Sequence, residues 1–147
     1  MPDRILIAPD KFKGSLTAPE VAEAVAAGVL RRSPDARVCR TPVADGGDGT
    51  VRAALTGGYR QVPVRATGPL GDPVDTEIAV DGDTAVVELA TASGLALLDA
   101  DDLAPLAASS EGTGELIAAA LDAGARRILL GVGGSASTDG GAGMLVA

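Results

Sequence analysis

An apolar run that stops at a glycine-rich loop is the feature that most constrains this chain. Residues 128–132 read Ile-Leu-Leu-Gly-Val and lead into Gly-Gly-Ser-Ala-Ser-Thr-Asp-Gly-Gly-Ala-Gly over residues 133–143. This pattern predicts a buried strand that delivers backbone N–H groups to a loop which a phosphate can approach closely. A second loop of the same type, Ala44-Asp-Gly-Gly-Asp-Gly-Thr50, lies upstream. Each loop could instead be an ordinary turn between a strand and a helix, but the pair together indicates a phosphate and metal site.

Composition and charge exclude several classes of function. The net charge of −8 arises from scattered acidic residues, which argues against a nucleic-acid surface or an anionic membrane as partner. The chain has no histidine, so Ser-His-Asp and Cys-His nucleophiles and histidine metal sites are excluded. A Walker-type loop is absent too. The single cysteine, Cys39, excludes a disulfide within the chain, and together with the lack of a secretory or membrane-spanning segment this predicts a cytoplasmic protein. Cys39 lies in an expected strand, where a small core residue is the favoured interpretation and a nucleophile the alternative.

The first third of the chain alternates strand and helix signals. An apolar strand is expected at 4–8, and a helix should begin at Thr17, since Thr17 and Glu20 have capping-box spacing before an apolar stripe of helical period. Ser33-Pro34 ends that stripe. A strand near 37–43 and a helix near 50–55 follow. This order predicts a parallel βαβα layer.

The middle of the chain changes to the two-residue alternation of half-buried strands. Residues 59–66, 74–80 and 84–89 carry this pattern, with Asp81-Gly82 as a tight turn, so they predict antiparallel hairpins. Helical periodicity returns weakly near 88–97 and more clearly over 114–123, and a last strand is expected at 126–132. The fold class is therefore α/β, with a mostly parallel, helix-flanked sheet and a hairpin-rich part.

Three sequence blocks carry a resemblance to a known family. They are Ile7-Ala-Pro-Asp-Lys-Phe-Lys-Gly-Ser-Leu16, Pro42-Val-Ala-Asp-Gly-Gly-Asp-Gly-Thr50 and the loop 131–144. In this order they resemble the type I glycerate kinase family. Two further segments support the same resemblance: Thr67-Gly-Pro-Leu-Gly71 and Glu111-Gly-Thr-Gly-Glu-Leu116. The resemblance covers essentially the whole chain. Family members are more than twice as long, so it implies the N-terminal part of a longer enzyme.

The resemblance implies ATP-dependent phosphorylation of D-glycerate with Mg²⁺, and the 2-hydroxyl as the acceptor. It also implies a flavodoxin-like α/β domain that includes residues 1–64, a second α/β domain that includes residues 65–147 and is incomplete, and a site in the cleft between domains. Phosphoryl transfer requires mainly positioning and charge neutralisation, which basic side chains, carboxylates and backbone amides provide.

The first loop carries four candidate residues. Asp10, Lys11, Lys13 and Ser15 follow the first strand and could hold a carboxylate or a phosphate, with Lys13 as a catalytic residue that neutralises the transferring group. Many family members have Ser at position 11, so Lys13 is the stronger candidate. The alternative is a solvated loop with surface lysines, in which Ser15 merely begins the helix entry.

The two glycine loops carry the other candidates. Asp45 is the expected catalytic base, Asp48 a Mg²⁺ ligand, and Gly46 and Gly47 give backbone access. Family members often have Glu at position 48. The later loop offers Asp139 as a second metal ligand. Phosphate contacts are expected from five other residues of that loop: Gly133, Gly134, Ser135, Ser137 and Thr138. Turn and N-cap roles are the alternatives for these Asp, Ser and Thr residues.

A different class of protein fits the last loop as well. Gly131-Val-Gly-Gly-Ser-Ala136 satisfies the loose dinucleotide-binding fingerprint after a strand, which would suit a redox or non-catalytic nucleotide-binding module. That reading leaves the first loop's lysines and the Asp-Gly-Gly-Asp-Gly segment unexplained. A third hypothesis is a truncated product without activity, whose sheet faces lack their covering partners.

Overall fold

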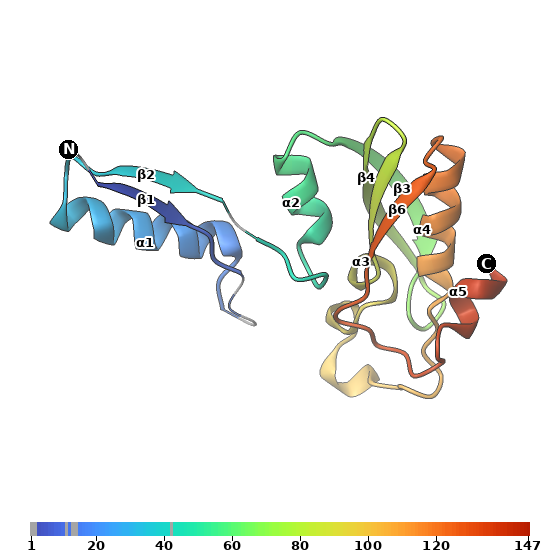
Figure 1. Ribbon diagram of the computed structural model, residues 1–147. Helices are drawn as coiled ribbons and strands as arrows, with labels where there is room; N and C mark the ends of the chain where they lie inside the picture. The colour runs from blue at the N-terminus through green and yellow to red at the C-terminus, as the bar shows by residue number, and fades with distance from the viewer. Residues whose placement is uncertain (1–2, 11, 13–14, 42) are drawn as a thin grey trace. The chain divides into compact units, whose positions relative to one another are not determined.

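The computed structural model describes residues 3–10, 12, 15–41 and 43–147, which form two compact units divided after Ala44 (Figure 1). The first unit contains β1 (Arg4–Ile7), α1 (Ala18–Arg32) and β2 (Arg37–Arg40). The two strands pair in parallel, with Ile5 opposite Val38. A parallel pair needs a crossover connection, and α1 supplies it. The predicted strand, helix and strand at the start of the chain are confirmed.

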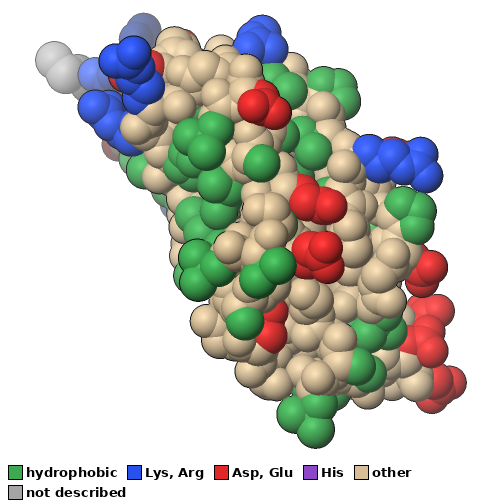
Figure 2. Space-filling view, turned by 90° about the vertical axis from the view of Figure 1, so that its right-hand side faces the viewer, with side chains coloured by type: hydrophobic (Ala, Val, Ile, Leu, Met, Phe, Trp, Pro, Cys, Tyr) green, Lys and Arg blue, Asp and Glu red, His purple; other side chains and the backbone are tan. Residues whose placement is uncertain are grey.

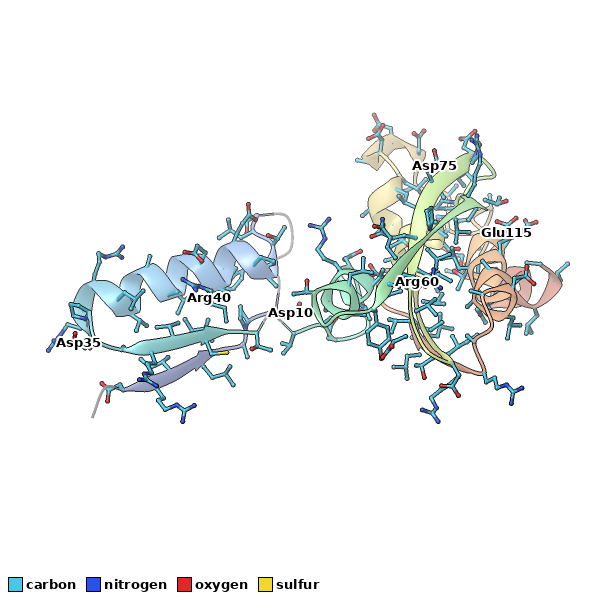
Figure 3. The ribbon with its side chains drawn as sticks, turned by 90° about the horizontal axis from the view of Figure 1, so that it is seen from above. Asp10, Asp35, Arg40, Arg60, Asp75 and Glu115 are labelled. Atoms are coloured by element: carbon cyan, nitrogen blue, oxygen red, sulfur yellow. The ribbon has the colours of Figure 1, made fainter. Side chains whose placement is uncertain are left out.

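The boundaries of α1 follow from its end residues. Thr17 donates its backbone N–H to Glu20 Oε2 at 2.7 Å, and its hydroxyl accepts the Glu20 backbone N–H at 3.4 Å, so the predicted capping box is present. The Thr17 N–H and hydroxyl both donate to the Glu20 carboxylate, and these two bonds lower its pKa. The helix ends at Arg32, before Pro34, and packs Ala22 and Ala26 against Ile7 of β1. An ion pair of 2.9 Å between Arg40 and Glu23 also joins β2 to α1 (Figure 3).

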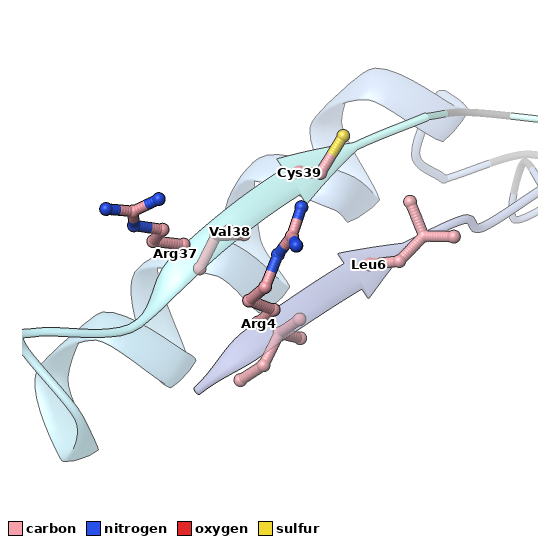
Figure 4. A pocket seen from close by; sticks show the side chains of 6 residues that line it. Arg4, Leu6, Arg37, Val38 and Cys39 are labelled. Carbon is pink, nitrogen blue, oxygen red and sulfur yellow. The ribbon is translucent and has the colours of Figure 1, made fainter. Parts of the chain in front are cut away.

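The other face of the two-stranded sheet is open within the first unit. Leu6 and Cys39 lie opposite each other in the register, and both are exposed (Figure 4). The prediction that Cys39 is a core residue is therefore wrong for this unit. Side chains alternate along a strand, so Cys39 falls on the face away from α1 while Val38 packs on the α1 side. An open groove along the two strands is lined by Arg4, Ile5, Leu6, Arg37, Val38 and Cys39.

The second unit is built on a four-stranded mixed sheet in the order β3-β4-β5-β6. Its strands are β3 (Arg60–Thr67), β4 (Pro73–Asp81), β5 (Thr84–Glu88) and β6 (Arg127–Gly131). β3, β4 and β5 pair antiparallel, and β5 and β6 pair in parallel. The helices are α2 (Thr50–Thr56), α3 (Ala90–Ser93), α4 (Glu111–Asp122) and α5 (Ala142–Val146), with short 3-10 turns at Leu95–Leu97 and Ala100–Asp102. The predicted α/β class and the antiparallel hairpins are confirmed.

Helices cover both faces of this sheet (Figure 1). Ile78 of β4 and Val87 of β5 are fully buried on the face that packs against Leu116 of α4. The adjacent residues Ala79 and Val86 point to the opposite face and pack against α2. Helix α2 was expected to complete the first parallel layer, but it packs on the second unit, because its buried Val51 side chain finds an apolar partner there.

The block Glu111–Leu116 explains why α4 begins three residues earlier than the predicted start at Gly114. Glycines weaken a helix signal in sequence, but here they allow close packing. A Cβ on Gly112 would overlap the Thr67 carbonyl oxygen, and one on Gly114 would lie 2.5 Å from the Met144 carbonyl oxygen. Glu115 accepts hydrogen bonds from the Thr67 N–H and hydroxyl (Figure 3). This block therefore holds α4 to β3 and α5.

The compact units do not divide at residue 64. Residues 45–64 pack with the second unit, through Val51 of α2 and through the β3–β4 pairing. The assignment of residues 1–64 and 65–147 to two domains of a longer protein stays a prediction. Figure 2 shows hydrophobic side chains interspersed with acidic ones on one surface. Within the described part of the chain, no helix has the length and apolar character needed to cross a bilayer.

Candidate functional site

The two glycine-rich loops predicted from sequence meet in the second unit. The Gly133 N–H donates a hydrogen bond of 2.8 Å to the Gly46 carbonyl oxygen. A Cβ on Gly133 would lie 2.7 Å from Gly47 Cα, and one on Gly131 would lie 2.7 Å from the Gly46 oxygen. Only glycine permits this backbone approach. Residues more than 80 positions apart in the sequence thus form one surface beside the carboxyl end of β6.

The loop 45–49 is held by its own side chains and by a strand. Asp45 Oδ1 accepts the Gly47 N–H at 3.0 Å, which makes a turn closed by the Asp side chain. The Thr50 hydroxyl donates to the Gly47 carbonyl oxygen at 2.7 Å. Gly46 and Gly49 have φ values of +90° and +99°, which favour glycine. Asp45 and Asp48 are both exposed. The turn role considered for Asp45 is therefore present, on a side chain that is exposed.

A buried carboxylate that the sequence reading missed fixes the end of this loop. Glu88 is only 2% exposed, and its two oxygens accept the N–H groups of Gly49 at 2.9 Å and Val51 at 2.8 Å. The available signal was a charged residue at the end of the apolar run Ala85-Val-Val87. Such a residue at the carboxyl end of a buried strand needs partners, because a buried charge is costly when it is unpaired.

Asp139 organises the later loop. Its Oδ1 accepts from the Ser137 hydroxyl and the Gly141 N–H, both at 3.0 Å. Its Oδ2 accepts from the Ser110 N–H at 2.9 Å, the Ser110 hydroxyl at 2.7 Å and the Gly143 N–H at 3.1 Å. The bonds from Ser110, followed by those from the two glycine amides, hold the pKa of this carboxyl well below its usual range. Asp139 thus joins the loop and the start of α5 to Ser110.

The remaining candidates of the later loop differ in what surrounds them. A side chain at Gly134 would lie 3.4 Å from Asp48 Oδ1, so Asp48 lies next to this loop. Ser135 is exposed, and its hydroxyl oxygen accepts the Ser137 N–H at 3.1 Å. The Thr138 hydroxyl donates to the Pro105 carbonyl oxygen at 2.8 Å. Ser135, Ser137 and Thr138 thus all make hydrogen bonds that shape this loop, and the Ser135 and Thr138 side chains are exposed as well.

Two of the four first-loop candidates lie in the described part of the first unit. Asp10 follows β1 and is half-buried. Ser15 is exposed, and its N–H and hydroxyl donate to the Phe12 carbonyl oxygen at 3.0 and 3.2 Å. This turn precedes the helix cap at Thr17, which matches the helix-entry alternative for Ser15. Lys11 and Lys13 lie outside the described residues.

Asp48 and Asp139, the two predicted Mg²⁺ ligands, differ in how well their surroundings suit this role. Mg²⁺ bound with a nucleotide commonly uses one or two protein carboxylates together with phosphate oxygens and water. Asp48, exposed and next to the Gly134 backbone, fits such a ligand. Asp139 does not, because both of its oxygens already accept hydrogen bonds that shape the loop. Among the residues described, no group of three or more acidic or cysteine side chains is placed to hold a metal ion.

The dinucleotide-binding interpretation of residues 131–136 does not match the local structure. In that motif the glycine turn opens directly into a helix whose N-terminus receives the pyrophosphate. Here α5 begins at Ala142, six residues after Ala136, and the Ala136 N–H donates to the Ser93 carbonyl oxygen at 3.0 Å. The loop runs back along α3 instead of entering a helix. The fingerprint is therefore a chance match to a different kind of glycine loop.

These features define an α/β protein in which two glycine-rich loops and their carboxylates share the carboxyl edge of parallel strands, a usual position for ligand sites in such sheets. The sequence profile of the Glycerate kinase family matches residues 5–147. The chain belongs to the glycerate kinase family, as the three blocks predicted.

Individual relatives support this family membership. The chain is 52% identical to a glycerate kinase of Bacillus subtilis over 98% of its length, and 51% identical to a glycerate 2-kinase of Escherichia coli over 98%. A crystal structure assigned as glycerate kinase 2 from Salmonella typhimurium LT2 superposes on the whole chain with a TM-score of 0.79 and 47% identity. The chain spans 38% and 39% of the two relatives and 40% of that structure.

Proposed function

We propose that this chain contributes part of the active site of a glycerate kinase, which transfers the γ-phosphoryl group of ATP to the 2-hydroxyl of D-glycerate. The observation that carries the proposal is the direct contact of the two glycine loops at Gly46 and Gly133. It gathers the glycine backbone of both loops and the Asp45 and Asp48 carboxylates on one edge of the sheet. Family membership supports the substrates, and the name of the Escherichia coli relative supports the 2-hydroxyl.

The candidate residues divide into groups with different proposed roles. Asp45, exposed and oriented by the Gly47 N–H, deprotonates or orients the glycerate hydroxyl. The backbone of Gly46, Gly47, Gly133 and Gly134, together with the Ser135 hydroxyl, borders the phosphates. Asp10, Lys11, Lys13 and Ser15 hold the carboxylate of glycerate or a phosphate, with Lys13 as the main neutralising charge. Ser137, Thr138 and Asp139 keep the later loop in shape.

Asp48 is the proposed carboxylate for Mg²⁺, which would arrive with ATP. When bound, the ion supplies charge neutralisation to the phosphate oxygens. The acidic composition and the single cysteine support a cytoplasmic location, where small-molecule substrates are the partners.

The test is ADP release by the protein encoded by the complete reading frame, supplied with ATP and Mg²⁺. The proposal expects release that depends on D-glycerate and is much weaker with L-glycerate, since a site for one hydroxyl at a chiral carbon discriminates between the enantiomers. A folded protein that releases ADP equally without glycerate would contradict the substrate assignment. A folded protein that releases none would contradict the kinase assignment.

A further inference from the structure

Glu88 is a buried carboxylate for which the proposed reaction has no direct use. It ends β5, pairs in register with Gly131 of β6, and is 2% exposed. Among the described residues it is the one charged side chain with so little exposure. Burying a carboxylate is unfavourable unless hydrogen bonds and a suitable environment compensate it. Its presence here therefore needs an explanation.

The hydrogen bonds of Glu88 are directed at one segment. Oε1 accepts the Gly49 N–H at 2.9 Å, and Oε2 accepts the Val51 N–H at 2.8 Å. Hydrogen bonds to an ionised acceptor are stronger than those between neutral groups. These two contacts hold the end of the loop 45–49 and the start of α2 against the carboxyl end of β5.

The same strand end also fixes the later loop. The Leu89 N–H, next in the chain after Glu88, donates to the Gly131 carbonyl oxygen at 2.9 Å. Gly131 in turn approaches Gly46 so closely that it has no room for a side chain. Glu88 and its neighbour thus hold both glycine loops from one point of β5.

We propose that Glu88 is a positioning residue for phosphoryl transfer: its two oxygens fix the loop 45–49 so that Asp45 and Asp48 face the loop that begins at Gly131. The proposal rests on the proposed kinase function. A carboxylate suits this position because both oxygens must accept. In Glu88→Gln the amide nitrogen would meet a backbone N–H and repel it, so one of the two contacts is lost with almost no change in volume.

If Glu88 only stabilised the fold, any substitution that destabilises α2 to the same extent should lower kcat as much as Glu88→Gln does. Val51→Ala provides the matched control, because it removes a buried side chain that packs against Ala79 and Val86 while keeping the backbone N–H that Glu88 binds. The experiment compares kcat, KM for ATP and melting temperature for the wild type, Glu88→Gln, Glu88→Asp and Val51→Ala. The protein encoded by the complete reading frame is used throughout.

The proposal expects kcat to fall at least tenfold in Glu88→Gln and less than threefold in Val51→Ala, at a similar loss of melting temperature. Glu88→Asp, which keeps two acceptors on a shorter chain, should lie between them. Equal kcat losses in Glu88→Gln and Val51→Ala would overturn the positioning role while the wild-type activity still supports the kinase. An inactive wild type would instead contradict the proposed function.

Amide hydrogen exchange in the wild type tests directly whether Glu88 holds the Gly49 and Val51 amides in solution, and it requires no variant and no activity assay. If Glu88 holds the loop, the Gly49 and Val51 amides exchange as slowly as those in the centre of β5. Exchange as fast as that of exposed turn amides would show that the two contacts do not persist in solution, and the proposal would fail even for an active kinase.

Discussion

The Gly46 carbonyl oxygen accepts the Gly133 N–H at 2.8 Å, and this bond joins two loops that are separated by more than 80 residues of sequence. The contact has room for backbone only, since a Cβ on Gly133 would lie 2.7 Å from Gly47 Cα. The expected ligand surface therefore depends on small residues as much as on charged ones.

Gly133→Ala is predicted to separate the loops. Overpacking against backbone should lower the free energy of unfolding by about 1–3 kcal/mol, and kcat/KM should fall at least tenfold. Gly28→Ala is the matched control, because the nearest atom to its Cβ would be 3.7 Å away on the flexible Arg31 side chain, inside helix α1. It should stabilise the protein by about 0.5–1 kcal/mol. Urea unfolding and steady-state kinetics measure both; an active, stable Gly133→Ala would contradict the loop contact.

Asp45→Asn is predicted to separate activity from stability. Asparagine keeps the Oδ1 acceptor for the Gly47 N–H, so the turn should survive and the melting temperature should change little. Loss of the general base should lower kcat by a factor of about 10² to 10⁴. Asp35→Asn, in the exposed turn after α1, is the control and should leave kcat unchanged. Normal turnover in Asp45→Asn would end the role assigned to Asp45.

Asp139 makes the stability of the second unit depend on acid pH. Because folding lowers the pKa of Asp139, its contribution is complete above the unfolded value of about 3.9 and is lost as the pH falls below it. The wild type should lose stability progressively from about pH 5 downward, through the unfolded value and on toward the much lower folded pKa, and Asp139→Asn should be less stable at pH 7 with a flatter profile. Thermal unfolding across this pH range measures the difference. Parallel pH profiles for the two proteins would show that the carboxylate does not anchor the loop.

The core of the second unit depends on one face of α4. Leu116 is fully buried against the sheet, whereas Leu121, on the same helix, is 56% exposed. Leu116→Ala should lower the free energy of unfolding by about 2–5 kcal/mol, and Leu121→Ala by less than about 1 kcal/mol. Similar losses in chemical denaturation would show that α4 packs on the sheet through a different face.

Local signals in the sequence were sufficient for much of the fold. The Thr17 and Glu20 pair fixed the start of α1, and the Asp81-Gly82 turn identified the β4–β5 hairpin, because capping and turn geometry involve only neighbouring residues. The start of α4 was placed too late, because its glycines are favourable only through their packing against Thr67 and α5. Local propensity carries no information about such contacts.

The sequence located the two loops of the candidate site but not the contacts that hold them together. Glycine patterns located both loops, and their composition indicated a ligand that approaches the backbone. Their contact through Gly46 and Gly133, and the clamp from Glu88, depend on pairings over dozens of residues that no local pattern encodes. By sequence Asp139 could equally have been a metal ligand or a helix cap, and its five hydrogen bonds, which include partners in distant segments, could not be read from any local pattern.

The most direct test of the account is detection of phosphoglycerate by ³¹P NMR after the protein encoded by the complete reading frame is incubated with ATP, Mg²⁺ and D-glycerate. We predict that 2-phosphoglycerate forms in the wild type and is strongly reduced in Gly133→Ala under the same conditions. No phosphoglycerate from a folded wild type, or full product formation in Gly133→Ala, would contradict the claim that the joined glycine loops carry phosphoryl transfer to glycerate.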